Sequence, residues 1–200
     1  MMGDRATLDF YEREAPSYTL SGREGPARHL DNFLSRLAPG ARILELGCGG
    51  GRDAAHMLKR GFDVVPTDGS AAMAKKGQER IGIAVQVMRF DELDAVEEYD
   101  AVWAHASIHH MPFDGLPDVL RRIARALKPG GWHYANFKLG EGEARDTFGR
   151  LYNFPPEEEL RAAYAAIPDW DFVDVLRYED GGLDKVMRDW MAITMHKKPA

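Results

Sequence analysis

The chain has 200 residues, of which 44% are hydrophobic and 29% charged, and its formal net charge is −6 at pH 7. This length and composition are typical of a single globular domain that needs no disulfide or metal for stability. The acidic balance argues against a nucleic-acid substrate, because binding a polyanion requires clustered lysine and arginine. The sequence contains no apolar run long enough for a membrane span, no signal-peptide core near its start and one cysteine, Cys48. We therefore expect a cytoplasmic protein without disulfide bonds or a membrane partner.

The N-terminal residues predict a short helix that stops before Pro16, followed by a loop. Apolar residues at helical spacing then predict a helix over 26–37, which Pro39-Gly40 ends. From there strands and helices alternate. The predicted strands are 41–46, 62–68, 84–90, 100–104 and 132–137, and the predicted helices are 54–60, 71–80, 92–97 and 116–127.

Alternating strands and helices are typical of βαβ units, so we predict an α/β fold with a mostly parallel sheet. The last third differs from this pattern. A helix over 157–166 precedes two apolar runs, 172–178 and 190–195, which predict an antiparallel hairpin at the edge of the sheet. We interpret residues 1–25 as an N-terminal lid segment and residues 26–200 as a single domain.

A glycine-rich loop, Gly47-Cys48-Gly49-Gly50-Gly51, lies between the first predicted strand and a helix. Glycines permit a tight turn and the close approach of a ligand, and the helix N-terminus offers free N–H donors. Asp68 ends the second strand 21 residues after Gly47. An acidic residue at about this spacing accepts hydrogen bonds from ribose hydroxyls. A plain turn at the loop, and a turn or helix-capping role for Asp68, are the alternatives.

Charged residues around the loop separate two classes of ligand. Arg52 stands where a dinucleotide-binding loop has its third glycine, and the acidic residues Glu45 and Asp53 flank the loop. An acidic rim favours a ligand with an ammonium or sulfonium group over a pyrophosphate.

The sequence resembles the class I, Rossmann-like S-adenosylmethionine-dependent methyltransferases over about residues 10–137. The matching motifs, in chain order, are Leu-Glu-Leu-Gly-Cys-Gly-Gly-Gly-Arg at 44–52, Thr-Asp-Gly-Ser at 67–70 with Met73, Phe90-Asp91, Tyr-Asp-Ala-Val-Trp at 99–103 and Ala-Leu-Lys-Pro-Gly-Gly at 126–131. The rest of the chain is similar to small-molecule members of this superfamily, including a group often labelled tellurite-resistance-like. The resemblance implies a Rossmann-like, doubly wound sheet with helices on both faces.

The same resemblance implies S-adenosyl-L-methionine as the cofactor and S-adenosyl-L-homocysteine as the product. Glu45 would hold the amino end of the cofactor, Asp68 its ribose, and the backbone of Gly47, Cys48 and Gly49 its methionine part. The remaining cofactor-binding residues that we expect are Gly69, Ser70, Met73, Phe90, Asp91, His105 and Tyr11. A place in the helix core for Met73, and helix capping by Asp91, are the alternatives.

Three histidines, His105, His109 and His110, follow the fourth predicted strand. One of them would act as a general base if the acceptor arrives protonated. The alternative is that they hold the loop after this strand in place or line the binding pocket. We expect no metal site, because no carboxylate or cysteine stands at ligand spacing from them.

Charged residues also follow the fifth predicted strand. Lys138, Arg145 and Arg150 are predicted to recognise an anionic acceptor, since arginine pairs well with carboxylates. A solvated loop with internal ion pairs is the alternative. Trp190 is interpreted as a residue of the sheet core.

Together these features predict an S-adenosylmethionine-dependent methyltransferase that acts on an unidentified small molecule by in-line displacement. The alternatives are a protein that binds this cofactor without transferring its methyl group and a nicotinamide-dependent oxidoreductase.

Overall fold

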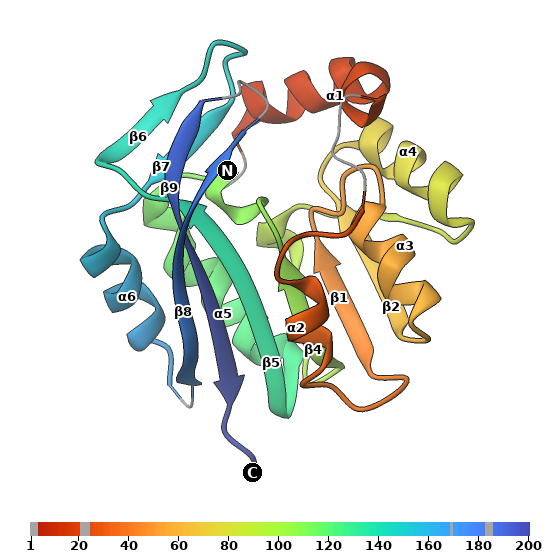
Figure 1. Cartoon of the computed structure of the whole chain (residues 1–200), viewed down its shortest axis with the longest axis vertical. Helices are drawn as coiled ribbons and strands as arrows, with labels where there is room; N and C mark the ends of the chain where they lie inside the picture. Colours follow the sequence, from red (N-terminus) through yellow and green to blue (C-terminus); the bar gives the residue numbers. More distant parts are fainter. Residues whose placement is uncertain (1–3, 21–24, 169, 183–185) are drawn as a thin grey trace.

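The computed structural model describes residues 4–20, 25–168, 170–182 and 186–200. Its centre is a seven-stranded sheet in the order β3-β2-β1-β4-β5-β9-β8 (Figure 1). The strands are β1 (Arg42–Leu46), β2 (Asp63–Asp68), β3 (Gln86–Val87), β4 (Tyr99–Ala104), β5 (Leu127–Lys138), β8 (Trp170–Gly181) and β9 (Met187–Lys197). β1 to β5 pair in parallel, and β9 is antiparallel to both β5 and β8. The predicted α/β sheet with a C-terminal antiparallel hairpin is confirmed.

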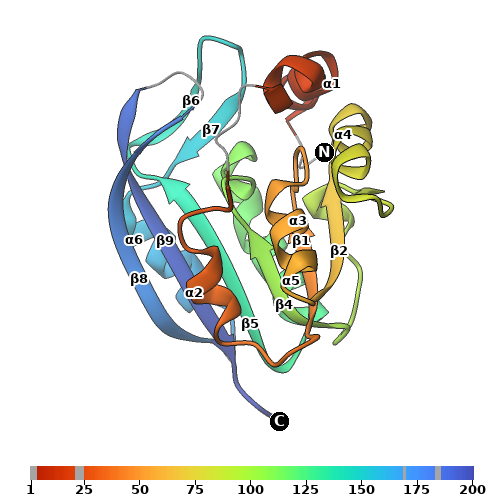
Figure 2. The ribbon, with the colours of Figure 1, turned by 45° about the vertical axis from the view of Figure 1, so that its right-hand side comes forward.

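Helices cover both faces of this sheet, as the two views show (Figure 2). The central strands are therefore apolar on both sides. The helices on the two faces are α2 (Leu30–Leu34), α3 (Arg52–Lys59), α4 (Ala71–Ile81), α5 (Leu116–Ala126) and α6 (Glu157–Ala165). In β4, Ala101 and Trp103 pack with α2 and α3, whereas Val102 and Ala104 pack with α5 and α6. The parallel strands end at one edge of the sheet, where a ligand of an open α/β sheet binds.

Two further elements lie near this edge. A small antiparallel ribbon pairs β6 (Gly142–Arg145) with β7 (Leu151–Phe154), in a stretch that the sequence analysis treated only as a charged connection. Helix α1 (Arg5–Leu20) packs beside α4 and reaches the ribbon (Figure 1). In the part of the chain that the structure describes, no helix is both long and apolar enough to cross a lipid bilayer.

The prediction that the first helix stops before Pro16 is wrong, because α1 continues through it. Asp4 caps the start of α1 by accepting hydrogen bonds from the backbone and hydroxyl of Thr7, at 2.8 and 2.7 Å. Tyr18, after the proline, packs its ring edge to face on that of Tyr11 at 5.1 Å, and Thr19 packs against Gly50. These contacts, together with the packing of α1 on α4, offset the one backbone hydrogen bond that a proline removes. The predicted lid segment also includes residues 1–3 and 21–24, which lie outside the described residues.

Three other predictions differ in extent. The predicted strand 84–90 is reduced to β3, an exposed two-residue edge strand. The predicted helix 92–97 is wrong, because residues 93–97 form neither helix nor strand. They follow a 3-10 turn, η1 (Phe90–Glu92), which is closed by a 2.8 Å hydrogen bond from the Arg89 N–H to the Glu92 carboxylate. The predicted helix 26–37 is helical only over α2. The exposed residues of β3 provide little buried contact to extend that strand.

Candidate active site

The glycine-rich loop joins β1 to α3 at the carboxyl edge of the parallel strands. Gly47 and Gly49 have φ angles of +76° and +56°, a region that other residues enter only with strain. The N–H groups of Gly47 and Cys48 donate to the Thr67 carbonyl at 3.0 and 2.8 Å. A Cβ on Gly47 would stand 2.5 Å from the Cβ of Ser107, so the loop after β4 packs directly on the glycine loop.

Asp68 connects this loop to the start of α4. Its carboxylate accepts hydrogen bonds from the Gly49 N–H at 2.8 Å and from the Ser70 N–H at 2.9 Å. Burial raises the pKa of Asp68 to about 6, against the effect of these two N–H groups. Ser70 caps α4 by accepting a 3.2 Å hydrogen bond from the Met73 N–H. The acidic side chain predicted to bind a ribose thus stands beside the loop predicted to bind the rest of the cofactor.

Glu45 lies buried below the loop with 3% of its surface exposed. No hydrogen-bond partner of its Oε2 atom is found among the described residues. Burial, followed by the charges of Asp53 and Asp68, raises the pKa of Glu45 well above its ordinary value. A cationic group of a ligand near these three carboxylates would stabilise their charged forms.

Asp53 has a larger role than the sequence analysis gave it. Its buried carboxylate accepts hydrogen bonds from the Ala27 N–H at 2.9 Å and the Trp103 indole at 3.0 Å, and it lies 3.9 Å from Nδ1 of His105. It thereby joins the chain before α2, the helix α3 and the end of β4. The position of Asp53 in the sequence, directly after Arg52, does not indicate these long-range partners.

The predicted adenine-side residues lie beside the same loop. Met73 is buried, and its Cε atom would be 3.5 Å from a Cβ on Gly49. The ring of Phe90 reaches within 3.8 Å of the corresponding position on Gly47. Asp91 forms an ion pair of 3.1 Å with Arg89, so its carboxylate is held at the start of η1.

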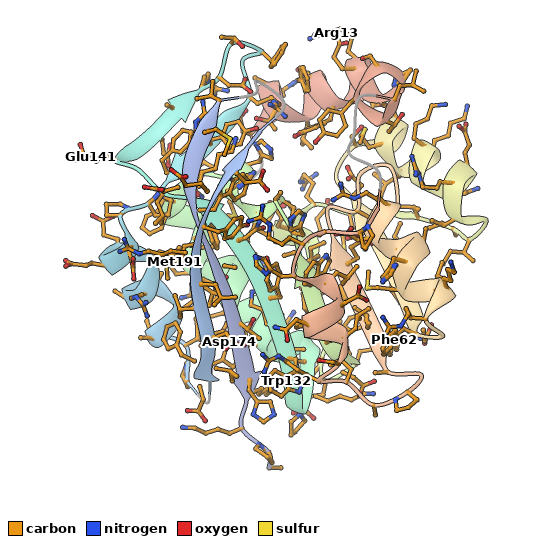
Figure 3. All side chains as sticks on the ribbon, viewed as in Figure 1. Arg13, Phe62, Trp132, Glu141, Asp174 and Met191 are labelled. Carbon is orange, nitrogen blue, oxygen red and sulfur yellow. The ribbon has the colours of Figure 1, made fainter. Side chains whose placement is uncertain are left out.

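Helix α1 lies over these residues. Leu8 comes within 2.9 Å of a Cβ built on Gly69, and Thr19 comes within 2.9 Å of one built on Gly50. The Glu12 carboxylate accepts hydrogen bonds of 2.7 and 3.1 Å from a hydroxyl and a backbone N–H at the first turn of α4. The outer face of the helix carries Arg13, which points away from the molecule (Figure 3). The inner face of α1 therefore covers both the glycine loop and the end of β2.

The three histidines have different surroundings. His105 stacks on Trp103 at 5.9 Å between ring centroids, and burial lowers the pKa of His105 although Asp53 opposes this. His109 is 1% exposed, its Nδ1 has no partner among the described residues, and burial lowers its pKa strongly. His110 differs, because both of its ring nitrogens are engaged.

The hydrogen bonds of His110 fix its protonation. Its Nδ1 lies 2.7 Å from the Leu151 carbonyl, which only accepts, so Nδ1 carries the proton. Its Nε2 then accepts from the Tyr11 hydroxyl at 2.9 Å, while that hydroxyl accepts from Arg150 at 2.9 Å. Burial lowers the pKa of His110 to about 3, in agreement with a neutral ring.

Both predicted acceptor-binding arginines contact α1 or the ribbon in this structure. Arg145 makes a two-pronged ion pair with Asp4, at 3.0 and 2.7 Å. Arg150 is 2% exposed and pairs with Asp146 at 2.6 Å as well as with Tyr11. Glu141, just before β6, points to solvent (Figure 3).

Asn136 in β5 fixes the loop that carries the histidines. Its side-chain oxygen accepts a 2.6 Å hydrogen bond from the Ala106 N–H, and its amide donates to the Tyr178 hydroxyl at 2.8 Å. Ala106 has a φ of +51°, which is strained for alanine. This role of Asn136 was not predicted, although an amide side chain within a mainly apolar strand was a detectable signal.

Comparison with known proteins agrees with this arrangement. The family described as "Methyltransferase domain" matches residues 43–131. A ubiquinone biosynthesis O-methyltransferase of Xanthomonas campestris is 33% identical over 110 residues, which are 51% of this chain and 45% of that protein. A trans-aconitate 2-methyltransferase of Deinococcus radiodurans is 32% identical over 115 residues, 54% of this chain and 42% of that protein. The chain spans about half the length of the curated relatives it matches.

Solved structures share the fold over most of the chain. The 1,6-didemethyltoxoflavin-N1-methyltransferase of Burkholderia thailandensis, with 1,6-didemethyltoxoflavin and S-adenosylhomocysteine bound, has a TM-score of 0.77 and 22% identity, covering 96% of this chain and 88% of that one. The [4+2]-cyclase SpnF has a TM-score of 0.76 and 16% identity, covering 100% and 99%. Residues 43–131 therefore match the family described as "Methyltransferase domain", and the chain shares its fold with the 1,6-didemethyltoxoflavin-N1-methyltransferase.

Proposed function

We propose that this protein transfers a methyl group from S-adenosylmethionine to a small-molecule acceptor by in-line displacement. The observation that carries the proposal is the Asp68 carboxylate, which the Gly49 and Ser70 N–H groups hold beside the glycine loop. The family match over residues 43–131 and the methyltransferase names of the relatives support it. The acceptor's lone pair forms the new bond to the methyl carbon, and the electrons of the carbon–sulfur bond stay on sulfur.

The cofactor-binding assignment follows the geometry around the loop. Asp68 would accept hydrogen bonds from the ribose hydroxyls, and Glu45 would lie near the ammonium group. The residues that would complete the site are Gly47, Cys48, Gly49, Gly69, Ser70, Met73, Phe90 and Asp91. The acidic surroundings of Glu45 favour the positively charged cofactor over its neutral product, because the sulfonium loses its charge in the reaction.

His105 is the histidine that we propose as the general base when the acceptor carries a proton. The carboxylate of Asp53, 3.9 Å from its Nδ1, would stabilise the imidazolium that forms. His110 has neither nitrogen available while Tyr11 and Leu151 hold it, so its role is to position α1. Tyr11 accordingly closes the site from the α1 side.

The remaining assignments concern the surroundings of the reaction. We propose that residues 1–25 act as a lid on the domain formed by residues 26–200, in line with the covering position of α1. Arg145 and Arg150 hold this lid through Asp4 and Tyr11. The net charge of −6 and the single cysteine favour a cytoplasmic protein that acts on a small molecule, with no nucleic-acid or membrane partner.

Calorimetric titration tests the cofactor. We expect S-adenosylmethionine to bind with a dissociation constant of about 1–100 μM and Asp68→Ala to weaken this at least about tenfold, since a charged hydrogen-bond acceptor is lost. NADH is the control ligand and should give no signal. Tight binding of NADH without binding of S-adenosylmethionine would contradict the proposal and favour an oxidoreductase.

A second candidate function is binding of the cofactor without methyl transfer. The observation that favours it is the structural similarity to a protein named as a [4+2]-cyclase rather than a methyltransferase. Release of S-adenosylhomocysteine with small-molecule acceptors distinguishes the two candidates. Methyl transfer to any acceptor, lost in His105→Ala or Asp68→Ala, supports the first candidate.

A further inference from the structure

Asn136, near the carboxyl end of β5, is a buried amide that joins two segments lying far apart in the sequence. Its side-chain oxygen accepts a 2.6 Å hydrogen bond from the Ala106 N–H after β4, and its nitrogen donates to the Tyr178 hydroxyl of β8 at 2.8 Å. Because a backbone N–H only donates, the first bond decides which end of the amide is the oxygen. The second bond then holds the amide in that orientation, and the side chain is 1% exposed.

Ala106 has a backbone conformation that depends on such support. Its φ is +51°, and the other non-glycine residue with a positive φ in the described part of the chain is Glu97. For alanine the left-handed region is disfavoured by about tenfold in population. A hydrogen bond from the Ala106 N–H to a fixed acceptor stabilises this conformation against a relaxed one. The oxygen of Asn136 therefore offsets strain that arises from the alanine side chain.

The strained residue lies between two residues of the candidate site. His105 precedes Ala106, and Nδ1 of its ring is 3.9 Å from the Asp53 carboxylate. Ser107 follows Ala106, and its Cβ is 2.5 Å from the position of a Cβ on Gly47. A backbone rotation at Ala106 would displace both neighbours, because each is bonded directly to it. The conformation of this one alanine therefore determines where the proposed general base and the surface that packs on the glycine loop lie.

The antiparallel half of the sheet packs around the other end of the amide. The ring of Tyr178 stacks on that of Trp190 at 6.1 Å between centroids, and Trp190 is 5% exposed, in agreement with its predicted place in the sheet core. Lys138 lies on the same face of β5 as Asn136 and is 3% exposed, with its ammonium nitrogen 3.8 Å from the centroid of the Tyr152 ring. Recognition of an anionic acceptor by Lys138 stays a prediction. Close packing on this face restricts the amide to one orientation.

We propose that Asn136 is a positioning residue of the candidate site, which acts by holding Ala106 in its left-handed conformation. It thereby keeps His105 beside Asp53 and Ser107 against the glycine loop. The amide acts through the backbone of the loop after β4 rather than on the reacting atoms. This inference rests on the proposed function and adds the residue that holds the proposed general base and the cofactor loop in place together.

Calorimetric titration with S-adenosylhomocysteine tests this role in two backgrounds. Asn136→Ala removes the acceptor of the Ala106 N–H, so the loop relaxes and no longer packs on the glycine loop. We expect binding to weaken about tenfold. Ala106→Gly adopts the left-handed conformation without strain, so in that background Asn136→Ala should weaken binding only about twofold or less. Equal losses in the two backgrounds would show that Asn136 does not act through strain at Ala106.

His133→Ala is the matched control for a general effect on the sheet. His133 is buried on the opposite face of the same strand, and its ring nitrogens lie 3.1 Å from the Val102 carbonyl and 3.2 Å from the Tyr164 hydroxyl. Its loss should lower the urea midpoint of unfolding and leave the affinity for S-adenosylhomocysteine unchanged. If His133→Ala weakens binding as much as Asn136→Ala does, the effect belongs to the strand as a whole and the positioning role is wrong.

Tyr178→Phe provides a second, milder variant. It keeps Asn136 and removes only the hydroxyl that accepts from its amide. We expect binding of S-adenosylhomocysteine to weaken about threefold, and less in the Ala106→Gly background. If Asn136→Ala does not fold, this variant decides the question, and unchanged binding by Tyr178→Phe then overturns the proposal.

The unmodified protein separates the positioning role from the proposed function. If it binds S-adenosylhomocysteine and Asn136→Ala binds with the same affinity, the positioning role is overturned and the proposed function stands. If the unmodified protein does not bind S-adenosylhomocysteine, the proposed function is contradicted and the positioning role falls with it.

Discussion

The pKa of Asp68 is subject to opposing effects of burial and hydrogen bonding. Two backbone N–H groups stabilise its carboxylate, yet burial dominates and raises its pKa to about 6. The nearby Glu12 carboxylate on α1 raises it further. Ribose hydroxyls would donate hydrogen bonds to the ionised form of Asp68, so the cofactor and the proton compete for this side chain.

The first prediction concerns the pH dependence of cofactor binding. If the carboxylate form of Asp68 accepts the ribose hydrogen bonds as we propose, affinity for S-adenosylhomocysteine should fall as the pH is lowered through about 6. Calorimetry between pH 5 and pH 8 measures this directly. Asp68→Asn cannot ionise and should bind weakly with little pH dependence in this range. A wild-type affinity that is constant across the range would contradict the assigned role.

Gly47 is the residue at which the backbone geometry is most demanding. Its φ is +76°, and a Cβ would stand 2.5 Å from that of Ser107. Gly61 has a similar φ of +85°, but a Cβ there meets nothing within 4 Å. The two glycines thus separate the effect of backbone conformation from that of close packing.

We predict that Gly61→Ala lowers the free energy of unfolding by about 1–2 kcal/mol, the cost of placing alanine in the left-handed region. Gly47→Ala should cost more and should also weaken cofactor binding at least about tenfold, because the loop after β4 must move. Urea denaturation and calorimetry give the two quantities. Similar cofactor affinities for both variants would show that the contact with Ser107 does not matter for binding.

At the scale of elements, α1 connects the two sides of the site. Its inner face contacts the glycine loop and α4, while Thr7 accepts a 2.8 Å hydrogen bond from the Leu151 N–H of β7. An ion pair between Arg145 and Asp4 adds to this attachment, and Arg150, which donates to the Tyr11 hydroxyl, forms a second ion pair with Asp146 inside the ribbon connection. Arg145 and Asp4 are 48% and 12% exposed, whereas Arg150 and Asp146 are 2% and 7% exposed.

This difference in burial predicts different costs of removing each arginine. Arg150→Met should lower the free energy of unfolding by about 3–5 kcal/mol, because it leaves the Asp146 carboxylate buried without its partner. Arg145→Met should cost about 1 kcal/mol or less, since water replaces an exposed partner. Urea denaturation of both variants measures the difference. Equal costs would mean that the Arg150 pair is not buried in solution.

The sequence predicted those elements whose signals are local. The strands β1, β2 and β4 carry apolar residues on both of their faces because both faces are buried, and the glycine loop and Asp68 follow from residue type and spacing. The full length of α1 and the β6–β7 ribbon were not predictable in this way. They depend on partners far apart in the chain, such as Thr7 with Leu151, which no local pattern contains.

The residues of the candidate site also fall into two groups, those that lie in sequence motifs and those whose roles depend on partners far away in the chain. The cofactor-side residues lie in motifs, so their positions followed from the resemblance. The roles of Asp53 and Asn136 depend on hydrogen bonds to Trp103 and Ala106, which only the folded chain brings together. Arg150 was predicted to recognise an anionic acceptor, and the sequence alone does not reveal its contacts with Asp146 and Tyr11.

The whole molecule combines a parallel half and an antiparallel half in one sheet. The parallel strands β1, β2 and β4 end at the candidate cofactor site, whereas β5 and β9 bring Lys138 and Trp190 side by side in their register. Helix α1 lies across both halves at this edge (Figure 1). Removal of α1 should therefore affect ligand exchange more than the integrity of the sheet.

We predict that a variant lacking residues 1–25 still unfolds in one cooperative transition, because the apolar clusters on both faces of the sheet need few residues of that segment. Its dissociation of S-adenosylhomocysteine should be at least about tenfold faster, since Leu8 and Thr19 no longer cover the glycine positions beside the cofactor. Stopped-flow fluorescence measures the rate. Arg13→Ala, on the exposed face of α1 (Figure 3), is the control and should leave the rate unchanged. If the shortened chain folds and releases S-adenosylhomocysteine at the unmodified rate, α1 does not act as a lid.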